Sequence, residues 1–225
     1  NAEGSFWLGS EFEFFEVPIE SSSFWNPSSS PMYFAESQMS SSQNSPQAIQ
    51  EQFASAQQLQ SQGNLEGAIA QYQEILEADK THLAALHRLA QIAESQGKFD
   101  QAIERYRKAI SLDSNPPFWV YRHLGFALDR EGQLDEAIVA YRKALGLNPE
   151  DVSTYGLLGQ AQGKIGDIDG AISSYQQQIA LSTDVPIWVY LNLGDGLSQV
   201  DRVEEAIEAY TKALALAPEN EGIRR

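Results

Sequence analysis

The clearest pattern along this chain is an apolar stripe that recurs at helical spacing. Steps of three and four residues separate Leu134, Ala137, Ile138 and Tyr141. Side chains at these steps lie on one face of an α-helix, because the helix completes a turn about every 3.6 residues. The pattern therefore predicts an amphipathic helix that buries this face.

The same stripe occurs five times. An Ala-Ile pair begins four residues before a tyrosine each time, and an apolar residue followed by an acid stands three residues before each alanine. The tyrosines are separated by 34, 35, 34 and 35 residues and are Tyr72, Tyr106, Tyr141, Tyr175 and Tyr210. Self-similarity at this period predicts a tandem array in which each unit is one supersecondary motif.

Each unit is predicted to be a helix, a short turn and a second helix. A glycine stands just before the stripe in four units, where a tight turn needs the positive φ that glycine adopts at low cost. These residues are Gly63, Gly97, Gly132 and Gly166, and the fifth unit has Asp201 instead. Small residues such as Ala90 and Gly125 in the first helices would let the paired helices approach closely. An all-α structure is expected for residues 49–220.

A longer period of 69 residues lies over the shorter one. The segment Pro117-Phe118-Trp119-Val120-Tyr121 recurs as Pro186-Ile187-Trp188-Val189-Tyr190, each time with one inserted residue. We infer that the array grew by duplication of a pair of units.

These features resemble the tetratricopeptide repeat family, whose pattern places a large residue, Leu-Gly, Ala, an aromatic residue and Pro along about 34 residues. The third unit matches the pattern best, with Tyr121, Leu124-Gly125, Ala137, Tyr141, Ala144 and Pro149. The resemblance implies a right-handed α-solenoid of five repeats at residues 49–82, 83–116, 118–151, 152–185 and 187–220. Residues 221–225 would form the C-terminal end.

Both ends of the predicted array depart from the family pattern. The first repeat has Gln52 and Ser55 where the third has Tyr121 and Leu124. Its first helix is therefore expected to belong to a degenerate repeat at the end of the array. No solvating helix is expected after the fifth repeat, which would leave an apolar face of the last hairpin open. That face suggests either truncation or self-association through the C-terminal repeat.

Residues 1–48 differ in kind from the array. They contain six glutamates, nine of the chain's 23 aromatic residues, many serines and no Lys or Arg. Two short alternating runs that flank Gly9-Ser10 predict a small β-hairpin with an aromatic face at residues 6–14. Because an isolated two-stranded hairpin is marginally stable in water, we expect this segment to need another surface to pack on. The Ser- and Pro-rich residues 21–48 are predicted to be a tether.

Charge and composition narrow the range of partners. Thirty-one acids against fifteen bases give a net charge of −16, which argues against nucleic acid or an anionic membrane as the partner. No apolar run approaches the roughly 20 residues that a membrane-spanning helix needs. The chain has no cysteine, and we expect a cytoplasmic location.

The family resemblance implies that the first helices line a concave groove that holds a partner segment. At the ligand-facing positions the chain has His87, Gln91, Trp119, Arg122, Phe126, Asp129, Arg130, Gln160, Lys164, Trp188 and Asp195. Bases beside aromatic residues favour a peptide that carries acids and aromatic anchors, as the N-terminal segment of this chain or of a neighbouring copy does. The alternative is that Trp119 and Trp188 only seal joints between hairpins and that the bases are ordinary solvated charges.

Other kinds of site are disfavoured by the residues present. The carboxylate clamp of chaperone-binding family members needs Lys and Asn at positions where the first two repeats have Phe53, Gln57, His87 and Gln91. The only histidines, His82, His87 and His123, lack the spacing of a metal-binding pair on a helix, so neither a metal nor another cofactor is expected. No set of nucleophile, base and orienting group is evident.

The leading hypothesis is therefore a non-catalytic protein-interaction scaffold. The alternative is an accessory region of a larger bacterial enzyme, because the paired repeats are similar to those attached to glycosyltransferase, sulfotransferase or methyltransferase domains in bacterial chains.

Overall fold

The structure is a computed structural model that describes residues 45–217, and within this range the regular structure is α-helix alone. Its helices are α2 (Pro46–Ser61), α3 (Leu65–Ala78), α4 (Leu83–Ser95), α5 (Phe99–Leu112), α6 (Phe118–Arg130), α7 (Leu134–Leu147), α8 (Val152–Ile165), α9 (Ile168–Leu181), α10 (Ile187–Gln199) and α11 (Val203–Leu216). The predicted hairpin at residues 6–14 and the C-terminal end lie outside the described residues, as does the tether up to residue 44. Helix α2 starts at Pro46, slightly ahead of the predicted start of the first repeat at Ile49.

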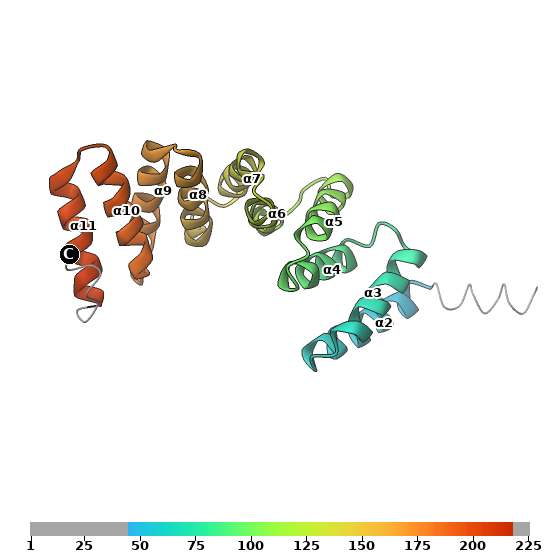
Figure 1. The fold of residues 1–225 in the computed structure, drawn as a ribbon. Helices are drawn as coiled ribbons and strands as arrows, with labels where there is room; N and C mark the ends of the chain where they lie inside the picture. The colour runs from blue at the N-terminus through green and yellow to red at the C-terminus, as the bar shows by residue number, and fades with distance from the viewer. Residues whose placement is uncertain (1–44, 218–225) are drawn as a thin grey trace, which may run out of the picture. The chain divides into compact units, whose positions relative to one another are not determined.

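The helices pack in sequence order as five hairpins, α2 with α3, α4 with α5, α6 with α7, α8 with α9 and α10 with α11. Each hairpin also contacts the next one along the chain, through α3 and α4, α5 and α6, α7 and α8, and α9 and α10. Figure 1 shows the hairpins following one another from blue to red. The prediction of an all-α, right-handed solenoid of helix–turn–helix repeats is confirmed.

The turn inside each hairpin depends on one residue with a left-handed backbone. The values of φ are 81°, 71°, 77° and 82° at Gly63, Gly97, Gly132 and Gly166. In this region a Cβ atom comes too close to the following carbonyl oxygen, so glycine is favoured. Asp201, with φ of 61°, is the only non-glycine residue with positive φ in the described part of the chain. The predicted turn positions are thus correct, including the one where glycine is missing.

The two helices of a hairpin approach each other where a tyrosine ring of the second helix lies on a small residue of the first. The fully buried Tyr141 ring lies so close to Gly125 that a Cβ atom on the glycine would be 2.7 Å from its Cδ1. The same approach joins Gly159 to Tyr175, and Gly194 to Tyr210. The predicted role of small residues in the first helices is therefore confirmed at these three hairpins.

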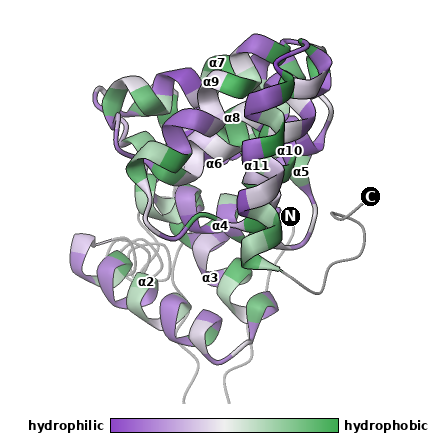
Figure 2. Cartoon of the chain, turned by 90° about the vertical axis from the view of Figure 1, so that its left-hand side faces the viewer, coloured by the Kyte–Doolittle hydropathy of each residue, from purple (hydrophilic) through white to green (hydrophobic). Residues whose placement is uncertain are grey.

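The buried residues form three clusters along the array. One spans α2 to α4 around Tyr72, the next spans α4 to α8 around Tyr106 and Tyr141, and the third spans α9 to α11 around Tyr175. Figure 2 shows hydrophobic and hydrophilic residues sharing individual helices, as expected of amphipathic helices that bury one face. The cores therefore follow the stack of hairpins.

The longer period of 69 residues is visible at the start of α6 and α10. Each of these helices is preceded by a proline in an extended conformation, Pro117 with ψ of 152° and Pro186 with ψ of 144°. A proline residue fits this place because its missing N–H group would have no helical partner there. The two inserted residues of the longer period thus fall in the connections between hairpins.

Candidate functional site

Several first-helix residues predicted to line the groove pack against rings of a neighbouring hairpin. The ring of His87 meets Trp119 edge to face with 4.7 Å between centroids, Phe126 meets Phe99 at 6.2 Å, and Trp188 meets Tyr175 at 6.3 Å. Burial of the His87 ring lowers its pKa below the ordinary value for histidine. Trp119, Phe126 and Trp188 are half-buried, so they hold the hairpin joints together and also keep part of each ring exposed.

The three predicted bases all have intramolecular partners. Arg122 donates from Nη1 to both carboxylate oxygens of Asp151, at 3.0 and 3.1 Å. Lys164 donates from Nζ to Oδ1 of Asp129 at 2.6 Å. Arg130 is exposed, and its guanidinium lies 5.6 Å from the centroid of the Phe99 ring. Two of the three positive charges are therefore already matched by acids, Arg122 by Asp151 at the end of the same repeat and Lys164 by Asp129 of the preceding repeat.

Tyrosines of the second helices hold polar side chains of the first helices in place. The hydroxyl of Tyr106 donates to Glu94 at 3.1 Å, and Nδ1 of His123 lies 3.1 Å from the same Glu94 oxygen. Tyr210 donates to Asp195 at 2.6 Å. Burial, with the neighbouring Asp195 carboxylate adding to it, raises the pKa of Tyr210 to about 12. These bonds hold the carboxylates of Glu94 and Asp195 in one orientation.

Tyr141 is the exception to this arrangement. Its hydroxyl is buried without a hydrogen-bond partner in the described part of the chain. Asp129 stands twelve residues before it, the place from which Glu94 reaches Tyr106, but Asp129 bonds Lys164 instead. Burial, followed by the nearby Asp129 carboxylate, raises the pKa of Tyr141. Asp129, predicted to face a ligand, is thus a buried residue that positions Lys164.

A hollow of about 420 Å³ lies between α8 and α10, above one face of α9. Three of the predicted groove residues, Gln160, Lys164 and Asp195, line it together. The hollow is also lined by Asn192, Gln199, Ile168, Ala171, Tyr175, Gly163 and Gly196. The structure therefore gathers three of the four residues predicted in repeats four and five around one hollow, and Trp188 is not among the residues that line it. His87 and Gln91 of the second repeat are not part of it.

Asn192 and Gln199 line the same hollow but are not among the predicted groove residues. The Asn192 side chain donates to the hydroxyl of Tyr175 at 3.3 Å, and Gln199 donates to the backbone carbonyl of Asp195 at 3.3 Å. The sequence did contain a signal, because Asn192 is the only asparagine at its first-helix position among the five repeats. Gln199 is the last residue of α10, where the exact end of the helix decides whether the side chain reaches the groove.

Over residues 45–217, no three His, Asp or Glu side chains come together in a way that would hold a metal ion. None of the helices in that range combines the length and the apolar character needed to cross a bilayer.

Comparisons with known proteins agree with the repeat architecture. Models described as tetratricopeptide repeat match residues 59–119, 152–184 and 188–220, and one described as TPR repeat matches residues 129–166. No curated protein matches the chain.

Solved structures with the same fold are tetratricopeptide solenoids. A crystal structure of MamA is 28% identical with a TM-score of 0.68, covering 71% of this chain and 92% of that one. A MamA from Desulfovibrio magneticus is 21% identical with a TM-score of 0.69, covering 77% and 97%. YrrB, described as a TPR protein with an unusual peptide-binding site, is 20% identical with a TM-score of 0.71, covering 82% and 93%. With its helical hairpins, its turn glycines and these matches, the chain belongs to the tetratricopeptide repeat family.

Proposed function

We propose that the chain is a non-catalytic interaction scaffold that binds an extended peptide segment in the hollow between α8 and α10. The observation that carries the proposal is the chemistry of the lining, where Gln160, Asn192 and Gln199 surround an apolar floor that includes Ile168 and Tyr175. A side-chain amide both donates and accepts hydrogen bonds. An extended segment offers one backbone donor and one acceptor at most residues, so the two sets are complementary.

The charged residues of this hollow favour a peptide that carries acids. Lys164 donates to Asp129, yet 49% of its side chain remains exposed, so its ammonium group can donate to a second carboxylate as well. The half-buried rings of Trp119, Phe126 and Trp188 extend along the same first-helix face as candidate anchors for aromatic side chains. The peptide we favour is therefore acidic and aromatic, and YrrB offers a parallel as a TPR protein described with a peptide-binding site.

Residues 6–16 of this chain have the composition of such a peptide, with aromatic residues and three glutamates and no base. We propose this segment, from the same chain or from a neighbouring copy, as one occupant of the hollow. A tether of roughly 28 residues has a typical end-to-end distance of about 30 Å, which gives a linked segment an effective concentration on the order of millimolar. Even weak binding would then be populated.

The test is binding of a labelled synthetic peptide that copies residues 6–16, measured by fluorescence anisotropy on residues 46–225, with circular dichroism as the check on folding. Gln160→Ala should weaken binding about tenfold, because a buried peptide group would lose its partner. The matched control is Gln177→Ala, an exposed glutamine on the second helix α9, which should leave binding unchanged. Equal affinity of both variants and the parent would refute binding in this hollow.

A further inference from the structure

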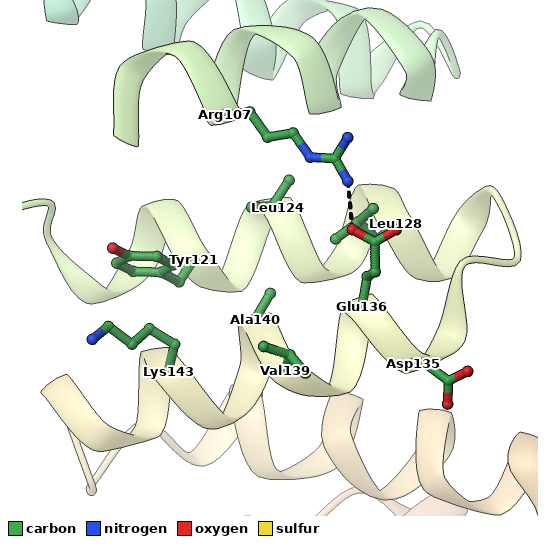
Figure 3. A pocket seen from close by; sticks show the side chains of 9 residues that line it. All are labelled: Arg107, Tyr121, Leu124, Leu128, Asp135, Glu136, Val139, Ala140 and Lys143. Carbon is green, nitrogen blue, oxygen red and sulfur yellow. Dashed lines mark hydrogen bonds and ion pairs between the residues drawn. The ribbon is translucent and has the colours of Figure 1, made fainter. Parts of the chain in front are cut away.

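A second hollow is lined by residues of α5, α6 and α7 (Figure 3). It lies on the side of α6 that faces away from the predicted groove residues. Its volume is about 420 Å³, and its floor is formed by Tyr121, Leu124 and Leu128 of α6 with Val139 and Ala140 of α7. Each of these α6 residues follows a predicted groove residue of the same helix by two positions, as Leu124 follows Arg122. Two positions correspond to a rotation of roughly 200° around the helix axis. This hollow is therefore separate from the concave groove.

A small residue on α7 leaves the space open. Ala140 occupies a position where the first, second and fourth repeats have the larger Gln71, Arg105 and Ser174. Ser174 is buried there and donates to Gln162 at 2.6 Å. The fifth repeat again has alanine, Ala209, and a smaller hollow of about 240 Å³ lies beside it. The 69-residue period thus places equivalent hollows at the third and fifth repeats.

The hollow of the third repeat has the apolar Val139 at its rim, where the hollow of the fifth repeat has Glu208. Val139 stands at the edge with 67% of its surface exposed. The other repeats have Ala70, Glu104, Ser173 and Glu208 at this position. A single exposed valine needs no explanation, but Val139 adjoins a hollow whose floor is apolar, with Leu124 and Leu128 largely buried beneath it.

The two ends of this hollow carry opposite charges. Lys143 and Tyr121 lie at one end, and Asp135 and Glu136 lie at the other (Figure 3). Arg107 of α5 reaches Glu136 at 2.6 Å, but both side chains are at least half exposed, so this ion pair contributes little and can open. Lys143 has no ion-pair partner within residues 45–217. A complementary occupant is acidic at the Lys143 end and apolar along its middle.

The walls of the hollow favour a helical occupant over an extended one. They consist of α5, α6 and α7, whose backbone groups are bonded within each helix, and no side-chain amide lines the surface. An extended segment would bury unpaired backbone groups here, at a cost comparable to a lost hydrogen bond for each. A helix satisfies its own backbone and can place apolar side chains one turn apart in a groove.

We propose that the hollow formed by Tyr121, Leu124, Leu128, Val139 and Ala140 is a docking site for a short amphipathic helix of a partner protein. The helix has acidic residues in its first turn, which meet Lys143, and apolar residues that cover Leu124 and Val139. It runs antiparallel to α7, which also places its positive N-terminal end beside the negative C-terminal end of α7. The scaffold then holds two partners of different form, an extended segment on one face and a helix on the other.

The experiment uses two stapled helical peptides of identical composition and the full chain. One has two glutamates in the first turn, two leucines one turn apart and two lysines in the last turn, and the other has the glutamates and lysines exchanged. Fluorescence anisotropy should show about tenfold tighter binding of the acid-first peptide. Lys143→Glu should abolish that preference. Val139→Glu should weaken binding of the acid-first peptide at least about tenfold, because it would bury a carboxylate against leucine.

Val139→Glu is a safe variant for folding, since Glu104 and Glu208 occupy this position in other repeats of the same array. The matched control is Glu208→Gln in the hollow of the fifth repeat, which should leave binding of both peptides unchanged. The proposal is overturned if the two peptides bind equally, or if Val139→Glu binds like the parent chain. It also fails if Val139→Glu converts a sedimenting dimer into a monomer, because the occupant would then be a second copy. The proposal also fails if Gln160→Ala, and not Val139→Glu, loses binding of the acid-first peptide. That result would mean that the peptide binds in the concave groove, which is compatible with the proposed function.

Discussion

At the scale of single residues, the contact of Gly125 with Tyr141 shows how little space the helix joints contain. A Cβ atom on Gly125 would lie 2.7 Å from the tyrosine ring, closer than nonbonded atoms normally approach. The first two repeats have Ala56 and Ala90 at the equivalent position, so those joints accommodate a methyl group. The ring position in the third repeat is therefore adapted to glycine.

We expect Gly125→Ala to lower the free energy of unfolding by about 1–3 kcal/mol, the usual cost of overpacking a filled core. Gly146→Ala is the control, because no atom lies within 4 Å of the Cβ it would add on the exposed part of α7. That change should raise the free energy of unfolding by about 0.5–1 kcal/mol, since alanine loses less backbone entropy in a helix. Urea unfolding of both variants measures the difference. Similar effects of the two changes would mean that the ring moves aside freely.

The candidate site could be predicted from the sequence only as far as the repeat register reaches. Register places Gln160, Lys164 and Asp195 on one face, and the structure gathers them around one hollow. The register does not predict that Arg122 is bonded to Asp151. The two residues are 29 positions apart, which is not the repeat length, so they occupy different positions within the repeat. Such pairs depend on the angle between neighbouring hairpins, which periodicity does not specify.

At the scale of helices and turns, Asp201 is where the sequence conflicts most with the local structure. In the turn before α11, Asp201 has φ of 61°, and the other four hairpins have glycine with positive φ at this position. Aspartate tolerates this region better than most residues but still bears a cost that glycine avoids. The absence of glycine was evident in the sequence, because the turn position follows directly from the repeat.

Asp201→Gly should raise the free energy of unfolding by about 0.5–1 kcal/mol, the gain from relieving the turn less the added entropy of an unfolded glycine. Gly132→Asp, the reverse change in the equivalent turn of the third repeat, should lower it by a similar amount. Thermal unfolding of the two variants beside the parent chain checks the prediction. A loss of stability in Asp201→Gly would show that the aspartate side chain makes a stabilising contact at this turn.

At the scale of the whole array, stability is distributed by position along the stack. In repeat arrays each unit contacts mainly its neighbours, so stability is close to a sum of local terms. The helices from α5 to α7 lie within the largest buried cluster and have hairpins on both sides. Helices α2 and α11 are the outermost described helices and have packed neighbours on one side of their hairpins.

Hydrogen exchange measured by mass spectrometry should therefore be slowest in α5, α6 and α7. Among the helices it should be fastest in α2 and α11, because fewer contacts must be lost for local opening at the ends of the array. Addition of the peptide that copies residues 6–16 should slow exchange in α8 and α10. Uniform exchange across all ten described helices would instead indicate that the array opens as one cooperative unit.

The alternation of Ala140 and Ala209 with the bulkier Arg105 and Ser174 makes the pair of hairpins, and not the single hairpin, the unit by which such an array can be lengthened without damage. A copy of the third and fourth repeats inserted after the fourth would create one new junction, at which Tyr121 and Ala140 of the copy stand where Tyr190 and Ala209 of the fifth repeat now stand. A copy of one hairpin would instead place two neighbouring hairpins with the same residue at the Ala140 position side by side, which the second to fifth repeats do not do. Growth by pairs would add one further hollow of the kind beside Ala140 and Ala209 with each added pair of hairpins.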